Sequence, residues 1–164
     1  MKIKKLALSS ILLAVALILS YVESLVPLSF AVPGVKMGLP NLVILFALYR
    51  LGAKQAWAIS LVRVVLVSIL FGNLFSMVYS LAGAVLSLLV MLLLKRCGKF
   101  GTAGVSVAGG VAHNAGQILT AMVLLETAEI GYYLPVLCIS GTVAGICIGL
   151  VAALLIRRLP ASHS

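Results

Sequence analysis

The chain has 164 residues, of which 63% are hydrophobic and only 9% are charged. Soluble domains carry about 25% charged residues, so this composition excludes a soluble protein and predicts an all-α membrane protein with several crossings. The formal net charge of +9 does not indicate nucleic-acid binding, because the basic residues lie in short connections between apolar runs rather than along one face.

We expect one membrane domain, residues 1–164, because no hydrophilic stretch is long enough to form a second one. The cysteines form no CxxC pair and are odd in number, so they predict neither a disulfide framework nor a metal site. We interpret them as apolar packing residues and expect no cofactor. They are Cys97, Cys138 and Cys147.

Six apolar runs predict six transmembrane helices. The first run follows a short basic start, as in a signal peptide. It is, however, longer than the apolar core of about 7–15 residues that signal peptides have, and no A-x-A cleavage site follows it, so we interpret it as a helix. The expected helices cover approximately residues 6–26, 38–50, 55–71, 74–94, 102–125 and 132–156.

The segment 24–40 is the main irregular stretch of the chain. It is rich in prolines and glycines, which break helices, yet it is otherwise apolar and is expected to fold back onto the protein. The apolar run that follows, 41–49, crosses a bilayer only if its helix begins inside this segment. The second helix is therefore expected to be short or broken at its start.

The basic residues are distributed unevenly between the connections, which predicts the topology. An even number of crossings places both termini on one side, and cytoplasmic loops carry an excess of Lys and Arg. We therefore assign the termini to the cytoplasm, with Lys36 and the three glutamates outside. The basic residues that then fall inside are Lys2, Lys4, Lys5, Arg50, Lys54, Lys95, Arg96, Lys99, Arg157 and Arg158.

Small residues recur at every fourth position in the last two predicted helices. Rows of this kind let two membrane helices approach closely, so we expect these helices to cross each other. Packing alone explains the glycines, and we give them no chemical role. The rows are Gly104, Ala108, Ala112, Gly116 and Thr120, and then Gly141, Gly145, Gly149 and Ala153.

Four polar side chains lie near the middle of predicted membrane helices: Arg63, His113, Asn114 and Gln117. An arginine at this depth costs at least about 2.5–3.5 kcal/mol, so it is either paired within the protein, with Glu23 as a candidate partner, or binds an anion in a cavity. His113 and Gln117 are four residues apart and share a face, with Asn114 about 100° round the helix. These three either hydrogen-bond to neighbouring helices or face a ligand, and we favour the ligand.

Lys36 and Asn41 flank the bend at residues 38–40. They are either a solvated lysine and an asparagine that caps the second helix, or part of a lid over an anionic ligand. Three aromatic residues near the expected membrane interfaces are interpreted as anchors: Trp57, Tyr132 and Tyr133.

Five stretches of the sequence carry a resemblance to a known family. They are PGVKMGLPNLVILFALYRLG, the Arg63 helix ending in LFGN, YSLAGAVLSLLVM, GVSVAGGVAHNAGQ and YYLPVLCISGTVAGICIG. They resemble the Gx transporter family, also labelled heptaprenyl diphosphate synthase component I. That family is similar to the S components of energy-coupling factor (ECF) transporters, which are six-helix proteins that bind a vitamin or similar micronutrient. The resemblance implies a substrate-binding subunit in the cell membrane that works with a transmembrane coupling protein and two ATPases.

The residues do not support an enzyme. Chain-elongating prenyl diphosphate synthases bind the diphosphate through Mg²⁺ on aspartate-rich motifs, and this sequence contains no aspartate. A non-catalytic membrane partner of an isoprenoid enzyme stays open as the second hypothesis. An ion-coupled carrier is less favoured, because no acidic residue lies at the predicted membrane midplane. The preferred hypothesis is a transporter subunit that binds a small anionic ligand through Lys36, Asn41, Arg63, His113, Asn114 and Gln117.

Overall fold

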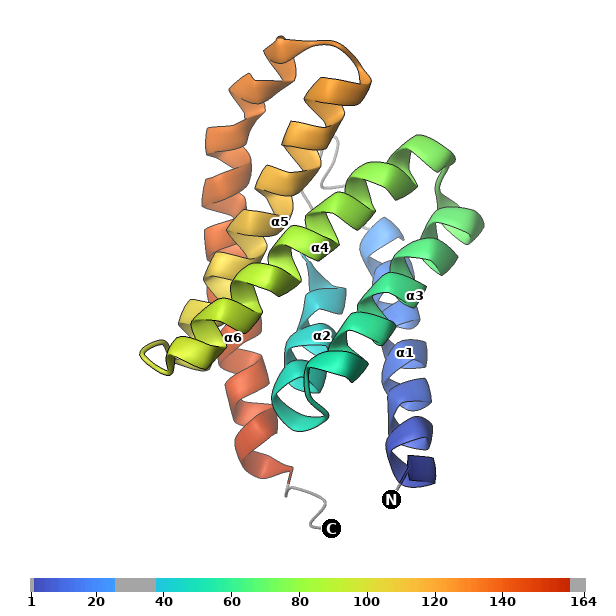
Figure 1. Cartoon of the computed structure of the whole chain (residues 1–164), viewed down its shortest axis with the longest axis vertical. Coiled ribbons are helices and arrows are strands. Elements are labelled where there is room, and N and C mark those ends of the chain that lie inside the picture. Colours follow the sequence, from blue (N-terminus) through green and yellow to red (C-terminus); the bar gives the residue numbers. More distant parts are fainter. Residues whose placement is uncertain (1, 26–37, 160–164) are drawn as a thin grey trace.

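The computed structural model describes residues 2–25 and 38–159, which form helices joined by short turns (Figure 1). The predicted all-α fold is confirmed. α1 begins earlier than expected, because lysine is a good helix former and the basic start continues the helix. That the chain forms a single domain stays a prediction. The elements are α1 (Lys2–Leu25), α2 (Leu39–Arg50), α3 (Ala53–Phe71), α4 (Leu74–Cys97), α5 (Thr102–Leu124), a 3₁₀ helix (Ala128–Tyr133) and α6 (Leu134–Arg158).

The helix α2 is much shorter than its neighbours. Its 12 residues extend over about 18 Å, whereas a bilayer core is about 30 Å thick. Within residues 2–25 and 38–159, five helices are long and apolar enough to cross a membrane, and α2 is not among them. The expectation of a short second helix is confirmed, while a sixth full crossing stays a prediction.

The start of α2 explains why the helix is short. Gly38 occupies the N-cap position with φ of 72°, a left-handed conformation that glycine adopts without strain, and Pro40 lies in the first turn. Asn41 lies inside the helix, where its backbone N–H donates to the carbonyl of Gly38 at 2.8 Å. The interpretation of Asn41 as the helix cap is therefore wrong.

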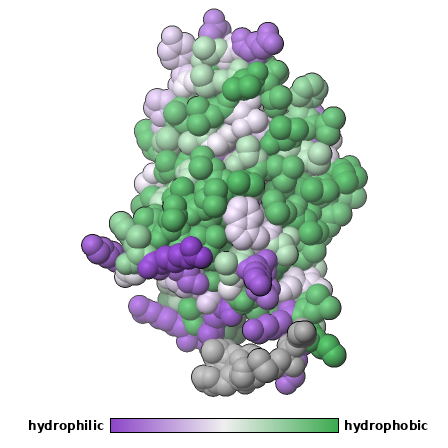
Figure 2. Space-filling model, viewed as in Figure 1, coloured by the Kyte–Doolittle hydropathy of each residue, from purple (hydrophilic) through white to green (hydrophobic). Residues whose placement is uncertain are grey.

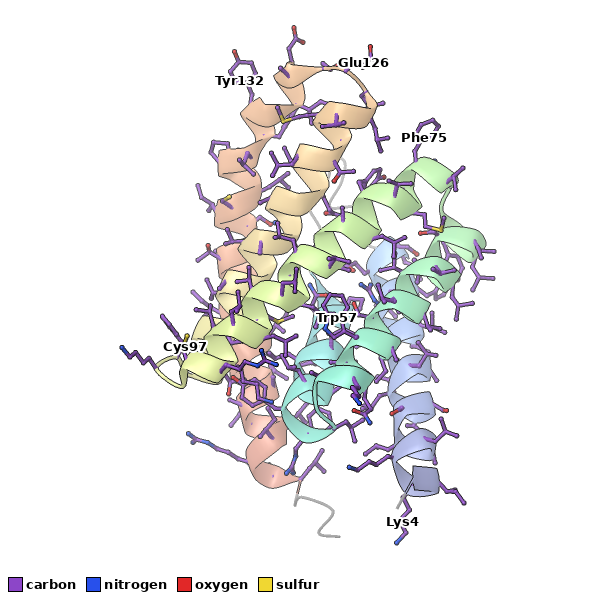
Figure 3. All side chains as sticks on the ribbon, in the orientation of Figure 1. Lys4, Trp57, Phe75, Cys97, Glu126 and Tyr132 are labelled. Carbon is purple, nitrogen blue, oxygen red and sulfur yellow. The ribbon has the colours of Figure 1, made fainter. Side chains whose placement is uncertain are left out.

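The two ends of the molecule contain different parts of the chain. The start of α1 and the end of α6 lie at one end of the bundle, and the connection between α5 and α6 lies at the other (Figure 1). An apolar belt separates the hydrophilic ends (Figure 2). Lys4 marks the first end and Glu126 the second (Figure 3). The arrangement is that of a multi-pass membrane protein, and the assignment of the first end to the cytoplasm stays a prediction.

Close backbone contacts join α5 to α6. A Cβ atom placed on Gly145 would lie 2.6 Å from the Cα of Val107, and one on Gly149 would lie 2.5 Å from the Cα of Ala103. Real Cβ contacts are never this short, so only glycine fits at both positions. The predicted close crossing of these two helices is confirmed.

The α5 side of this contact differs from the predicted row of small residues. Gly104 is exposed and a Cβ there would meet only Phe100, at 3.6 Å. Gly116, in contrast, meets the other neighbour, α4, at the Cα of Gly83. A row with a spacing of four turns by about 40° per step on a helix of 3.6 residues per turn, so it cannot face one partner throughout.

The core of the molecule is built around α2. Ile44, Leu45 and Leu48 are each at most 1% exposed. The ammonium group of Lys95, on α4, donates a 2.6 Å hydrogen bond to the carbonyl of Leu48, near the C-terminal end of α2. Trp57, on α3, is partly buried and packs against this core, and it is labelled in Figure 3. Its interpretation as a membrane anchor stays a prediction.

We predict that Gly145→Ala destabilises the protein, because the added methyl group would push α6 away from the α5 backbone. The expected loss is about 1–3 kcal/mol, as for other overpacked sites. Gly104→Ala is the matched control, since it also adds one methyl group within a helix but meets no other helix. Thermal unfolding in detergent micelles measures both, and equal melting temperatures would contradict the close crossing.

Candidate functional site

A cavity of about 230 Å³ lies between the helices. All six α-helices contribute residues to its wall, so it is an internal feature of the fold rather than a groove on one face. Small-molecule sites typically measure about 300–1,000 Å³, so this cavity is somewhat smaller than that range. Four of the six predicted site residues line it: Asn41, Arg63, His113 and Asn114.

Arg63 projects into the cavity from the middle of α3. One terminal nitrogen, Nη1, donates a 3.5 Å hydrogen bond to the hydroxyl of Ser20 on α1, which is at the limit of a hydrogen bond. Its Nε atom is buried and makes no hydrogen bond to any of the residues described. Among the described residues, this guanidinium group is therefore incompletely hydrogen-bonded, and a charged group of this kind binds anions well.

Glu23 lies on the same wall, three residues after Ser20 on α1. Its Oε1 atom accepts a hydrogen bond from the backbone N–H of Gly38, at the start of α2. A carboxylate at a helix N-terminus is favourable, because the backbone N–H groups there lack helical partners. Glu23 also interacts electrostatically with Arg63. The cavity wall thus carries one acidic and one basic side chain among the described residues.

The α5 cluster divides between the cavity and the neighbouring helices. Asn114 donates a 2.6 Å hydrogen bond from Nδ2 to the carbonyl of Leu137 on α6 and lines the cavity as well. His113 lines the cavity beside α4, where its ring and carbonyl lie against Gly83. Gln117 is not part of the cavity wall. Its Nε2 atom lies 3.5 Å from the hydroxyl of Ser80, and Ser80 does line the cavity.

Lys36 lies outside the described residues, so its place at the site stays a prediction. Asn41 reaches the wall from the first turn of α2, next to Gly38. The bend between α1 and α2 therefore brings Asn41 and Glu23 to the same cavity as Arg63.

Serine hydroxyl groups are the feature of the wall that the sequence analysis missed. Ser68, Ser87 and Ser106 are buried although each carries a polar group. Serine is small enough to fit a contact between membrane helices, so a serine in an apolar run does not by itself indicate a binding site. The signal that could have identified these serines is their recurrence in four different membrane helices. The lining serines are Ser20, Ser24, Ser68, Ser76, Ser80, Ser87 and Ser106.

The chemistry available at the cavity is binding by charge and hydrogen bonds. In the part of the chain that the structure describes, no group of three or more His, Cys, Asp or Glu side chains could hold a metal ion. What the wall offers is a guanidinium group, a carboxylate, amide and imidazole groups, and hydroxyl groups.

The fold and the cavity together define a multi-pass α-helical membrane protein with a polar internal cavity. A family model described as heptaprenyl diphosphate synthase component I matches residues 12–155. The chain belongs to this family, as its sequence motifs indicated. Comparisons with curated proteins and with solved structures gave no match.

We predict that Asn114→Ala destabilises the protein more than Gln117→Ala. Interhelical hydrogen bonds in membrane proteins contribute about 0.6 kcal/mol on average and up to about 1.7 kcal/mol. The 2.6 Å contact of Asn114 should lie at the upper end of this range, and the 3.5 Å contact of Gln117 at the lower end. Equilibrium unfolding in detergent compares the two variants. A larger loss for Gln117→Ala would show that the bond to Leu137 does not hold α5 against α6.

Proposed function

We propose that this protein is the substrate-binding subunit, of the S-component type, of an ECF-type micronutrient transporter in the cell membrane. The observation that carries this proposal is the internal cavity into which Arg63 projects a guanidinium group whose buried Nε atom has no hydrogen-bond partner among the described residues. An ion at this depth is costly unless a partner compensates it. Glu23 compensates part of this charge, and a ligand with an anionic group would supply the hydrogen-bond acceptors that the described residues do not.

In this proposal the site residues have distinct roles. Arg63 binds the anionic group, and Asn41, His113 and Asn114 hydrogen-bond to the rest of the ligand. Gln117 acts indirectly by orienting Ser80. Lys36 is proposed as a second cation near the site, with a smaller contribution than Arg63.

The proposed partners follow from the same class of transporter. A transmembrane coupling protein and two ATPases would supply the energy, and both termini of this chain would lie in the cytoplasm. The tight seams between α4, α5 and α6 support this proposal, because they let the helices move as one body when the subunit tilts in the bilayer. The protein itself is proposed to be no enzyme.

A second candidate function comes from the description of the family. Its name, heptaprenyl diphosphate synthase component I, supports a non-catalytic membrane partner of an isoprenoid enzyme. The sequence has no aspartate with which to hold the Mg²⁺ of a bound diphosphate, so catalysis would belong to the other component.

Native mass spectrometry of gently purified protein separates the two functions. A small molecule that stays bound, or a co-purifying coupling protein with ATPases, supports the transporter subunit. A soluble prenyl synthase component that co-purifies in the absence of any small molecule supports the second function and contradicts the first.

We predict that Arg63→Met abolishes most ligand binding and leaves the protein folded. Hydrogen bonds to charged groups contribute about 1.5–3 kcal/mol, which corresponds to about a 10–100-fold loss of affinity for the co-purified compound. The melting temperature without ligand should fall only modestly, because the variant loses the interaction with Glu23 but also no longer buries an incompletely hydrogen-bonded charge. Isothermal titration calorimetry measures the affinity, and thermal unfolding the stability.

Lys95→Met is the matched control, since Lys95 is a partly buried cation whose contact, with Leu48, lies away from the cavity wall. It should lower the melting temperature by removing the bond to Leu48 while leaving the affinity unchanged. If Arg63→Met instead strongly lowers the melting temperature and binds the compound as tightly as the wild type, Arg63 is a structural residue.

A further inference from the structure

Building on the proposed function, we propose that the ligand is a small hydrophilic zwitterion whose carboxylate binds Arg63 and whose ammonium group binds Glu23. The two side chains line the same cavity and interact with each other electrostatically. An amino acid or a closely related ammonium carboxylate has the matching pair of charges on neighbouring atoms.

The hydrogen-bonding capacity of both groups is incompletely used by the described residues. Arg63 has five N–H donors, and the structure shows one long contact to Ser20 and a buried Nε atom without a partner. Glu23 uses Oε1 for the backbone N–H of Gly38, and a carboxylate can accept about four hydrogen bonds. One group can therefore still donate, and the other can still accept.

The balance of charge on the wall disfavours a polyanion. Among the described residues of the wall, the positive charge of Arg63 is offset by the negative charge of Glu23. A diphosphate would bring at least two further negative charges next to Glu23, and like charges at short range in a poorly solvated site repel strongly. A zwitterion adds no net charge and places each of its groups beside its opposite.

The size and polarity of the wall limit the rest of the ligand. The cavity has a volume of about 230 Å³ and is lined by hydroxyl groups from four helices. Phe71 is the only Phe, Tyr or Trp among the described lining residues, so the wall offers little surface on which to stack a fused ring system. A long prenyl chain would place apolar surface against these hydroxyl groups, whereas a short polar side chain would hydrogen-bond to them.

The test is a binding screen on the purified wild-type protein in nanodiscs. The probes are the standard L-amino acids, the corresponding 2-hydroxy acids, in which a hydroxyl replaces the ammonium group, and the corresponding decarboxylated amines. Riboflavin, thiamin, inorganic diphosphate and farnesyl diphosphate complete the set. We expect at least one amino acid to stabilise the protein against heating and to bind at least about tenfold more tightly than its hydroxy acid and its amine.

Charge-removing variants then locate the two halves of the ligand. Glu23→Gln keeps an oxygen that can accept the hydrogen bond from Gly38, and should weaken binding of the amino acid at least about tenfold. It should leave binding of the hydroxy acid unchanged. Arg63→Met should weaken both. Ser60→Ala is the control, because Ser60 is buried but is not part of the cavity wall.

The outcomes distinguish this inference from the proposed function. Tight, Arg63-dependent binding of riboflavin or thiamin would overturn the zwitterion and leave the transporter subunit intact. Arg63-dependent binding of a hydroxy acid that equals binding of the amino acid would also overturn it, because Glu23 would then have no part. Binding of farnesyl diphosphate alone would overturn both. No binding of any amino acid at millimolar concentration would overturn the zwitterion, while a different co-purified small molecule would still support the transporter.

Discussion

The close approach of α5 to both α4 and α6 is the contact on which the rest of the structure depends. Gly116 meets the backbone of α4 near Gly83, and Gly110 meets the carbonyl of Gly141 on α6. Because the three helices touch at backbone distance, the polar residues of α5 are held in fixed positions on either side of the seam. This contact brings Asn114 to the carbonyl of Leu137 and places His113 on the cavity wall.

The polar cavity lies between all six α-helices, and glycines of the close α5–α6 contact, such as Gly110 and Gly141, also form part of its wall. Arg63 enters this space from α3. On α1, the Ser20 hydroxyl accepts a hydrogen bond from it, and the Glu23 carboxylate interacts with its charge. The same carboxylate accepts a hydrogen bond from the backbone N–H of Gly38, the N-cap residue of α2. One acidic residue therefore connects the charge of the cavity to the position of a neighbouring helix.

The sequence predicted the helices and the cationic residue of the site for the same reason. Each long apolar run has the length of a membrane crossing, and a charge inside such a run stands out, as Arg63 does. Glu23 was not selected, because a glutamate near a helix end also fits a solvated interface. The serines were missed because a hydroxyl group is compatible with both packing and binding. The burial of α2 in the core of the bundle was not predictable either, since a helix buried in protein and a helix that crosses the membrane are both apolar.

The two ends of α2 are held by opposite charges from other helices. Glu23 binds the backbone N–H of Gly38 at its start, and Lys95 binds the carbonyl of Leu48 near its end, so both charges match the helix dipole. A helix of 12 residues is too short to span the hydrocarbon core of a bilayer, so it is not expected to insert on its own. During biosynthesis α4 is made after α2. We therefore expect α2 to stay at the membrane surface, or with the insertion machinery, until α4 has been made. Lys95 can then bind Leu48, and the other helices can pack around α2.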